Sequence, residues 1–231
     1  MECIVLAGGL GTRLQSVVAD APKCMAPVNG EPFLHYMFRY LQQQGCTRVI
    51  LSLGYKHEVV TNWLATQHYG FDIDYVIEQE PLGTGGGIQL ALAKAVTNDV
   101  VVLNGDTMFR VDLKAFLQFH DTTAAHTTLA LKPMSNFERY GVVTIDDKGC
   151  ITAFEEKKHY DKGLINGGVY VINKQALAAK QLPLKHSLEK DYFEAYVHEG
   201  NMYGFVSDGY FIDIGIPSDY ETAQLDFKTL Q

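Results

Sequence analysis

Three glycines and an arginine stand close together in the segment LAGGLGTRL, which starts at Leu6 directly behind a short hydrophobic run. Gly8, Gly9 and Gly11 allow backbone N–H groups to approach a phosphate or a base, because no Cβ atom stands in the way. Arg13 adds a planar cationic fork that suits phosphate oxygens. The spacing GGxGTR is neither the GxGxxG of dinucleotide-binding folds nor the GxxxxGK[ST] of P-loops. The segment therefore indicates a phosphate or nucleotide site, with a plain glycine turn as the alternative.

Three further charged residues stand in unusual surroundings. Lys23 lies between a proline and a short apolar stretch in PKCMAP, where an ordinary surface lysine is the alternative interpretation. Asp106 follows VVVLNG at the carboxyl end of a predicted strand, although NGD is also typical of turns. Asp213 stands between Ile212 and Ile214, and a carboxylate there is costly to bury unless it is paired or metal-bound. Asp106 and Asp213 are therefore candidate metal ligands.

The composition is that of an ordinary packed globular protein, with 231 residues, 47% hydrophobic and 20% charged. The net charge of −8 argues against nonspecific nucleic-acid binding, because phosphate backbones attract basic surfaces. The four cysteines are widely spaced and form no zinc-binding pattern, so we expect reduced thiols in a cytoplasmic protein. We expect no signal peptide and no membrane contact, because the apolar stretches are too short to span a bilayer.

Strands and helices alternate through the first half of the chain. Apolar periodicity predicts, in order, strand 2–7, helix 32–45, strand 48–53, helix 57–67, strand 72–77, helix 85–96, strand 99–106 and helix 113–120. Phe33 and Met37 should share the buried face of one helix, and Val59, Trp63 and Leu64 that of the next. This alternation predicts an α/β fold with a mostly parallel sheet and helices on both faces.

Beyond Thr127 the connections become shorter and strands dominate. We expect strands at 127–133, 140–146, 150–157, 165–172 and 202–207, and helices at 187–200 and 217–230. No linker or internal repeat separates the halves. The sequence therefore predicts one domain over residues 1–231, with a first lobe (1–125) and a smaller, mixed β lobe (126–231).

The motifs, taken together and in order, resemble those of the sugar-phosphate nucleotidyltransferases. They are GGLGTR, PKCMAPVNG, EPLGTGGGI, LNGD, RYGVV, FEEK, INGGVYVI and FIDIGIPSDY, and they extend over essentially the whole chain. Within that family the resemblance is closest to the D-glycero-α-D-manno-heptose 1-phosphate guanylyltransferases, with the mannose-1-phosphate guanylyltransferases next. The resemblance implies a Rossmann-like nucleotidyltransferase fold and an enzyme that joins a nucleoside triphosphate to a sugar 1-phosphate and releases pyrophosphate.

The resemblance also implies roles for individual residues and Mg²⁺ as the cofactor. The implied catalytic residues are Arg13, Lys23, Asp106 and Asp213, and the last two would hold the metal. The implied nucleotide-binding residues are Leu6, Gly8, Gly9, Gly11, Thr12, Arg13, Glu78, Pro81, Gly83, Thr84 and Asp106. The implied sugar-phosphate-binding residues are Lys23, Gly141, Glu156, Lys157, Asn166 and Gly167. For Gly167, a strand bulge is the structural alternative.

Glu78, aligned by Pro81 and Gly83, occupies the position at which the family accepts hydrogen bonds from the base. A carboxylate accepts two hydrogen bonds, and guanine offers N1–H and N2–H₂ side by side, whereas uracil and thymine offer only N3–H. Glu78 thus favours GTP, with Glu80 as an alternative contact to the base. The glycines before the helix at 85–96 should also offer N–H groups to the ligand.

We therefore expect a guanylyltransferase that makes GDP-heptose for a bacterial-type surface polysaccharide. The alternatives within the family are a mannose-1-phosphate guanylyltransferase and a uridylyl- or thymidylyltransferase acting on a hexose 1-phosphate. From other classes, a metal-dependent glycosyltransferase would use a DxD pair such as Asp72 and Asp74, and an inactive regulatory homologue would lack one of the catalytic residues. We also expect no C-terminal β-helix, and leave a homodimer open.

Overall fold

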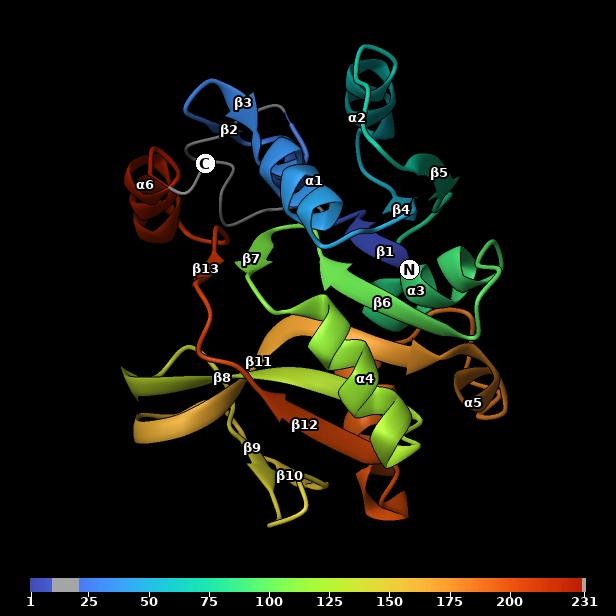
Figure 1. Ribbon diagram of the computed structural model, residues 1–231, viewed down its shortest axis with the longest axis vertical. Coiled ribbons are helices and arrows are strands. Elements are labelled where there is room, and N and C mark those ends of the chain that lie inside the picture. The colour runs from blue at the N-terminus through green and yellow to red at the C-terminus, as the bar shows by residue number, and fades with distance from the viewer. Residues whose placement is uncertain (10–20, 230–231) are drawn as a thin grey trace.

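The computed structural model describes residues 1–9 and 21–229, and Figure 1 shows the arrangement of its elements. The strands are β1 (Glu2–Ala7), β2 (Pro27–Val28), β3 (Glu31–Pro32), β4 (Arg48–Leu53), β5 (Asp72–Ile77), β6 (Asp99–Asn104), β7 (Thr107–Phe109), β8 (Thr127–Phe137), β9 (Val143–Ile145), β10 (Ile151–Phe154), β11 (Tyr160–Asn173), β12 (Met202–Val206) and β13 (Phe211–Asp213). The α-helices are α1 (Phe33–Gln43), α2 (His57–Leu64), α3 (Gly83–Leu92), α4 (Leu113–Thr123), α5 (Lys174–Ala178) and α6 (Pro217–Asp226). Shorter helical turns are the 3-10 helices η2 (Lys23–Met25) and η4 (Val197–Glu199) and the π-helix η3 (Leu188–Glu194).

A seven-stranded sheet in the order β12-β8-β11-β6-β1-β4-β5 forms the centre of the molecule. Strand β11 pairs antiparallel with both of its neighbours, and the other strands run in one common direction. The predicted mostly parallel sheet is therefore confirmed. The carboxyl ends of β1, β5 and β6 consequently lie at the same edge, where open α/β sheets bind their ligands.

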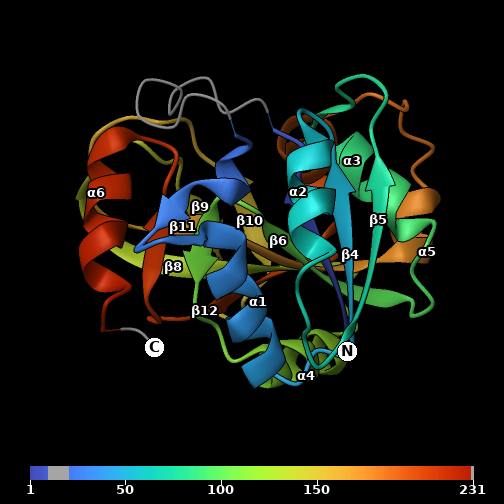
Figure 2. The same ribbon diagram turned by 90° about the horizontal axis from the view of Figure 1, so that it is seen from above.

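Helices cover both faces of the sheet, as the alternation predicted. Alternate residues of β1 show this arrangement. Cys3 and Val5 belong to a core cluster that also contains residues of α1, α4 and α6, whereas Ile4 belongs to a second cluster with residues of α3, α5 and η3. Figure 2 shows α6 and α5 at opposite ends of the molecule, as does Figure 1. None of the helices in the described residues is long and apolar enough to cross a bilayer.

The inward face of α2 differs from the prediction. Trp63 and Leu64 are partly buried and pack against the core as predicted, whereas Val59 is 36% exposed and Val60 is completely buried instead. The eight-residue helix is short, so an apolar pattern of about two turns does not fix its rotation against the sheet. The buried face predicted for α1 is confirmed, with Phe33 and Met37 fully packed.

Short strand pairs outside the central sheet position the loops at its ligand edge. Strands β7 and β13 pair antiparallel, as do β2 with β3 and β9 with β10. Strands β8 and β11 run further than predicted and pair along most of their length, with a register shift between Asn166 and Tyr170. The predicted helix at 187–200 is instead a π-helical turn followed by a 3-10 turn.

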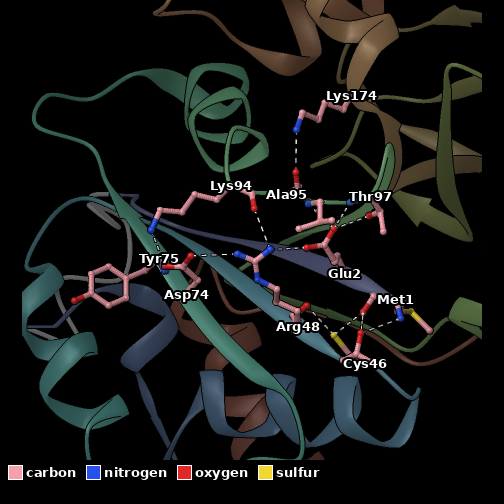
Figure 3. A network of polar contacts seen from close by, with 12 residues as sticks. Met1, Glu2, Cys46, Arg48, Asp74, Tyr75, Lys94, Ala95, Thr97 and Lys174 are labelled. Atoms are coloured by element: carbon pink, nitrogen blue, oxygen red, sulfur yellow. Dashed lines mark hydrogen bonds and ion pairs between the residues drawn. The ribbon is translucent and has the colours of Figure 1, made fainter.

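A polar network fixes the edge of the sheet opposite the ligand edge (Figure 3). Glu2 is only 6% exposed, and its carboxylate accepts hydrogen bonds from Arg48 and from the Val96 and Thr97 backbone N–H groups. Burial alone would raise the pKa of Glu2, but the bonds from Thr97, Arg48 and Val96 together lower it. Arg48 also contacts Asp74, which ties β1, β4 and β5 together.

We expect Glu2→Gln to destabilise the fold by about 2–3 kcal/mol at neutral pH, because it breaks a buried ion pair. Asp74→Asn removes the other acidic partner of Arg48 and, being more exposed, should cost about 1 kcal/mol or less. Ionised Glu2 stabilises the fold above the usual carboxyl pKa, and this stabilisation is lost as the pH falls through the lowered folded-state value. In urea unfolding, the difference in the free energy of unfolding between wild type and Glu2→Gln should therefore become smaller toward acid pH. A difference that does not change with pH would contradict this account.

Candidate active site

A pocket of about 360 Å³ lies at the carboxyl ends of β1, β5 and β6. Its walls contain eight of the predicted nucleotide-binding residues, namely Leu6, Gly8, Gly9, Glu78, Pro81, Gly83, Thr84 and Asp106. Lys23, Cys24, Asn104 and Gly105 complete much of the remaining surface. The predicted residues Gly11, Thr12 and Arg13 lie outside the described residues. This cavity is called the nucleotide pocket below.

The Glu78 carboxylate is held in a fixed orientation at the wall of the nucleotide pocket. Its Oε1 accepts a hydrogen bond from the Ser52 hydroxyl at 3.1 Å, and its Oε2 accepts one from the Leu82 backbone N–H at 3.0 Å. Gly8 and Gly87 make room for it, since a Cβ at either position would lie 2.7 or 2.8 Å from Oε1. Each carboxylate oxygen can accept a further bond, so Glu78 presents a pre-oriented acceptor pair to the pocket.

The glycines at the start of α3 serve packing within the chain. The N–H groups of Gly85 and Gly86 both donate to the His186 carbonyl oxygen, and a Cβ at Gly83 would lie 2.5 Å from the same oxygen. Gly83 also has a φ of +78°, in the left-handed region that favours glycine. The expectation that these N–H groups face a ligand is therefore wrong for Gly85 and Gly86, because a segment from the second half of the chain occupies them.

Lys23 and Asp106 form an ion pair between the 3-10 helix η2 and the turn that follows β6. The Lys23 Nζ lies 2.8 Å from Asp106 Oδ2, and both side chains are mostly buried. The 3-10 helix η2 positions the lysine, with Cys24 and Met25 packed into the core behind it. The awkward sequence environment of Lys23 thus reflects a cation directed into the nucleotide pocket, and an ordinary surface position is excluded.

Asp213 lies beside Asp106 because β13 pairs with β7. In this register Asp213 stands opposite Thr107, and the Ile214 N–H donates to the Asp106 carbonyl oxygen at 3.0 Å. Burial raises the pKa of Asp213, and the negative charge of Asp106 raises it further. Asp106 is thus close enough for its charge to act on Asp213, although the two residues are separated by 107 positions in the chain.

A second pocket of about 450 Å³ adjoins the first and contains Asp213. It includes the predicted sugar-site residues Gly141, Glu156, Lys157, Asn166 and Gly167. The remaining predicted sugar-site residue, Lys23, lines the nucleotide pocket instead. Asn104 lines both cavities, so the two pockets meet at the end of β6. The second cavity is called the sugar pocket below.

The floor of the sugar pocket depends on small residues. A Cβ at Gly141 would collide with the Glu155 carbonyl oxygen, and one at Gly167 would collide with the Phe109 ring. The register shift of β11 after Asn166 confirms a strand irregularity there, so the bulge and the pocket-lining position occur together. Asn166 donates to the Tyr170 hydroxyl at 3.1 Å and accepts from the Gly168 N–H at 2.9 Å.

Asn104 and Arg139 belong to the site but were not predicted from the sequence. Asn104, at the junction of the pockets, stands in the LNGD motif and could have been found from its place at a strand end. Arg139, in the RYGVV motif, lies 2.5 Å from Asp219 and 3.9 Å from Asp213. Tyr140, by contrast, is expected from the family resemblance to line the sugar pocket beside Gly141, and it does so; burial and the nearby Asp213 charge raise its pKa to about 12.

The DID segment does not contribute to either pocket. Asp72 is the first residue of β5, at the end of the strand opposite to Glu78. Asp74 contacts Arg48 and Lys94 in the network of Figure 3. This placement excludes the DxD pair that a metal-dependent glycosyltransferase would require here.

The family model described as "Nucleotidyl transferase" matches residues 2–229. The chain belongs to the nucleotidyl transferase family. Over 99% of both chains it is 51% identical to a D-glycero-alpha-D-manno-heptose 1-phosphate guanylyltransferase from Aneurinibacillus thermoaerophilus. It is 45% identical to the protein of the same name from Campylobacter jejuni, over 95% of this chain and 97% of that one. The crystal structure of HddC from Yersinia pseudotuberculosis complexed with GMP-PN superimposes with a TM-score of 0.86, at 36% identity over 98% and 99% of the chains.

Members of the nucleotidyl transferase family generally use a divalent metal. In the described residues no group of three or more His, Cys, Asp or Glu side chains could hold an ion. The pair Asp106 and Asp213 nevertheless fits such a metal. Burial and the neighbouring negative charge of Asp106 both raise the pKa of Asp213, and a bound cation would offset both effects. Oxygen ligands suit a hard cation, and substrate phosphates can supply the remaining ones.

Asp213→Asn should stabilise the nucleotidyl transferase fold at neutral pH by about 0.5–2 kcal/mol, because a buried, repelled charge is removed. Because the pKa of Asp213 is higher in the folded state, its ionisation lowers the free energy of unfolding. This loss develops as the pH rises from the usual carboxyl pKa through the raised folded-state pKa. Thermal unfolding should therefore show that the stability gained by Asp213→Asn over wild type becomes smaller toward acid pH. Asp219→Asn is the matched control and should destabilise, since it breaks the ion pair with Arg139. Destabilisation by Asp213→Asn would refute the interpretation.

Proposed function

We propose that this chain transfers GMP from GTP to D-glycero-α-D-manno-heptose 1-phosphate, giving GDP-heptose and pyrophosphate. The observation that carries the proposal is 51% and 45% identity, over nearly complete chains, to two guanylyltransferases named for this substrate. A further support is the likeness to HddC, whose structure contains the guanine nucleotide GMP-PN. The pocket with the pre-oriented Glu78 carboxylate is the feature of this chain that suits guanine.

The reaction needs two anionic reactants held in line. An oxygen of the sugar phosphate attacks the α-phosphorus of GTP, the new P–O bond forms, and the bond to the leaving pyrophosphate breaks. Two adjoining pockets that meet at Asn104 suit this requirement, because each can hold one reactant with its phosphates at the junction. The described residues lining the nucleotide pocket come from residues 6–106. Those lining the sugar pocket come from residues 140–213, apart from Asn104 and Thr107, which supports the proposed division into lobes that mainly hold one reactant each, at 1–125 and 126–231.

Charge neutralisation is the proposed task of the residues at the junction. Lys23 would contact the α-phosphate and the sugar phosphate, where negative charge develops. Arg13, outside the described residues, would bind the leaving pyrophosphate. Asp106 and Asp213 would hold Mg²⁺, which when bound supplies electrostatic stabilisation of the phosphates. A covalent route through Cys24 is unfavourable, because burial and the neighbouring Asp106 raise the pKa of its thiol to about 12.

Mannose 1-phosphate is the second candidate acceptor. The specific observation is a relative at 34% identity, a mannose-1-phosphate guanylyltransferase from Mycobacterium tuberculosis, which this chain matches over 98% of its own length and 64% of the relative's. Both sugars would be activated with the same nucleotide, so this alternative leaves the role of Glu78 unchanged. We further propose a cytoplasmic location, where GTP is available, and leave a homodimer as an expectation.

A pyrophosphate-release assay tests the proposed function. Four nucleoside triphosphates are each combined with D-glycero-α-D-manno-heptose 1-phosphate and with mannose 1-phosphate, with and without Mg²⁺. We expect release with GTP and heptose 1-phosphate, dependence on Mg²⁺, and loss of about 10²–10³-fold in kcat for Lys23→Met, the scale for removing one transition-state contact. Pyrophosphate release only with UTP or dTTP, or no release with any of the four nucleotides, would reject the proposal.

Glu78→Gln tests base recognition. Glutamine keeps one acceptor oxygen but replaces the other with a donor, so guanine loses one hydrogen bond to a charged group. We expect kcat/KM for GTP to fall by about 10–100-fold. Glu80→Gln is the matched control, because Glu80 is exposed and absent from the pocket wall, and it should change kcat/KM by less than about threefold. The opposite ranking would assign the base contact to Glu80.

A further inference from the structure

The segment 183–189, called the strap below, fastens the start of α3 to the second half of the chain. The His186 N–H donates to the Leu82 carbonyl oxygen, and the His186 carbonyl oxygen accepts from Gly85 and Gly86. The Gly86 position has no space for a Cβ because the Leu184 carbonyl oxygen lies against it. One wall of the nucleotide pocket and one wall of the sugar pocket are therefore built on a common, closely packed support.

Glu189 stands at the end of this strap, with its carboxylate anchored on one side. Its Oε2 accepts hydrogen bonds from the Thr84 hydroxyl at 2.7 Å and the Ser187 hydroxyl at 2.8 Å. The Leu188 N–H donates to the same Thr84 hydroxyl at 2.9 Å. Thr84 lines the nucleotide pocket, whereas Ser187 and Glu189 line the sugar pocket. The carboxylate is thus held in place by a residue of the neighbouring pocket.

The second oxygen of this carboxylate has no partner within the part of the chain that the structure describes. Both hydrogen bonds to the Glu189 carboxylate end on Oε2, and among the described residues none forms a hydrogen bond or ion pair with Oε1. Glu189 is close enough to Tyr170, in the pocket wall, that its charge adds to the effect of burial in raising the pKa of that phenol. A charged acceptor is therefore presented, already oriented, to the cavity that the proposed function assigns to the sugar.

We propose that Glu189 is a specificity-determining residue, which accepts a hydrogen bond from a hydroxyl group of the sugar 1-phosphate through Oε1. This inference rests on the proposed function. A carboxylate attracts hydroxyl donors and repels phosphate, so Glu189 orients the sugar with its hydroxyl face toward the strap and its phosphate toward Lys23 and Lys157. The two bonds to Oε2 reduce the entropy lost when the sugar binds, because the carboxylate is fixed beforehand.

Binding of heptose 1-phosphate to the full-length protein, measured by titration calorimetry alongside steady-state kinetics, tests this proposal. Glu189→Ala should weaken binding and raise KM for the sugar phosphate by about 10–100-fold, the loss expected for a hydrogen bond to a charged group. KM for GTP should change by less than about threefold. Glu189→Gln retains a neutral acceptor oxygen and should lose only about 2–10-fold.

Asp191→Ala is the matched control for a purely structural role. The Asp191 carboxylate also fastens the strap, by accepting from the Ser187 N–H at 2.7 Å, but it does not line the sugar pocket. We expect its KM for the sugar phosphate to stay within about threefold of wild type. Equal losses in Glu189→Ala and Asp191→Ala, or unchanged binding in Glu189→Ala, would overturn the assignment. Failure of the wild type to bind any sugar 1-phosphate would instead reject the proposed function.

Discussion

The site depends on two carboxylates that the fold forces together although they repel each other. Asp106 lies in the turn that follows β6 of the central sheet, and the pairing of β13 with β7 places Asp213 beside it. Burial and, after it, the negative charge of Asp106 raise the pKa of Asp213, so ionisation of this buried carboxyl is costly. Lys23 on one side and Arg139 on the other reduce that cost without removing it. A site that holds like charges together, with cations at its border, is suited to anionic ligands that arrive with a cation of their own.

The direction of the strands explains why these residues meet. Because β1, β5 and β6 are parallel, the loops that carry Gly8, Glu78 and Asp106 leave the sheet at the same edge. Within the described seven-stranded sheet, β11 alone runs antiparallel; it lies beside β6 and brings Asn166 from the opposite direction. The nucleotide pocket therefore belongs to the parallel part of the sheet, and the sugar pocket forms where the direction changes.

Much of this arrangement could be predicted from the sequence, since it follows from local patterns. Strand β1, helix α1 and the placement of Asp106 at a strand end all have periodic or positional signals in short windows. The rotation of α2, which buries Val60 in place of Val59, has no such signal, because an exposed and a buried valine look alike in two turns. The contact of Arg139 with Asp219 joins residues 80 positions apart, and no local pattern records that pairing.

The motif EPLGTGGGI shows that glycines in a predicted site can have a different physical role from the expected one. Its glycines suggested backbone groups open to a ligand, and Gly83 does line the nucleotide pocket. Gly85 and Gly86 are required for another purpose, since their N–H groups and their missing Cβ atoms accommodate the strap around His186. The glycines therefore bring the strap into contact with the helix that borders the nucleotide pocket. That contact is what allows Thr84 to hold Glu189, so the wall of one pocket fixes a charged group of the other.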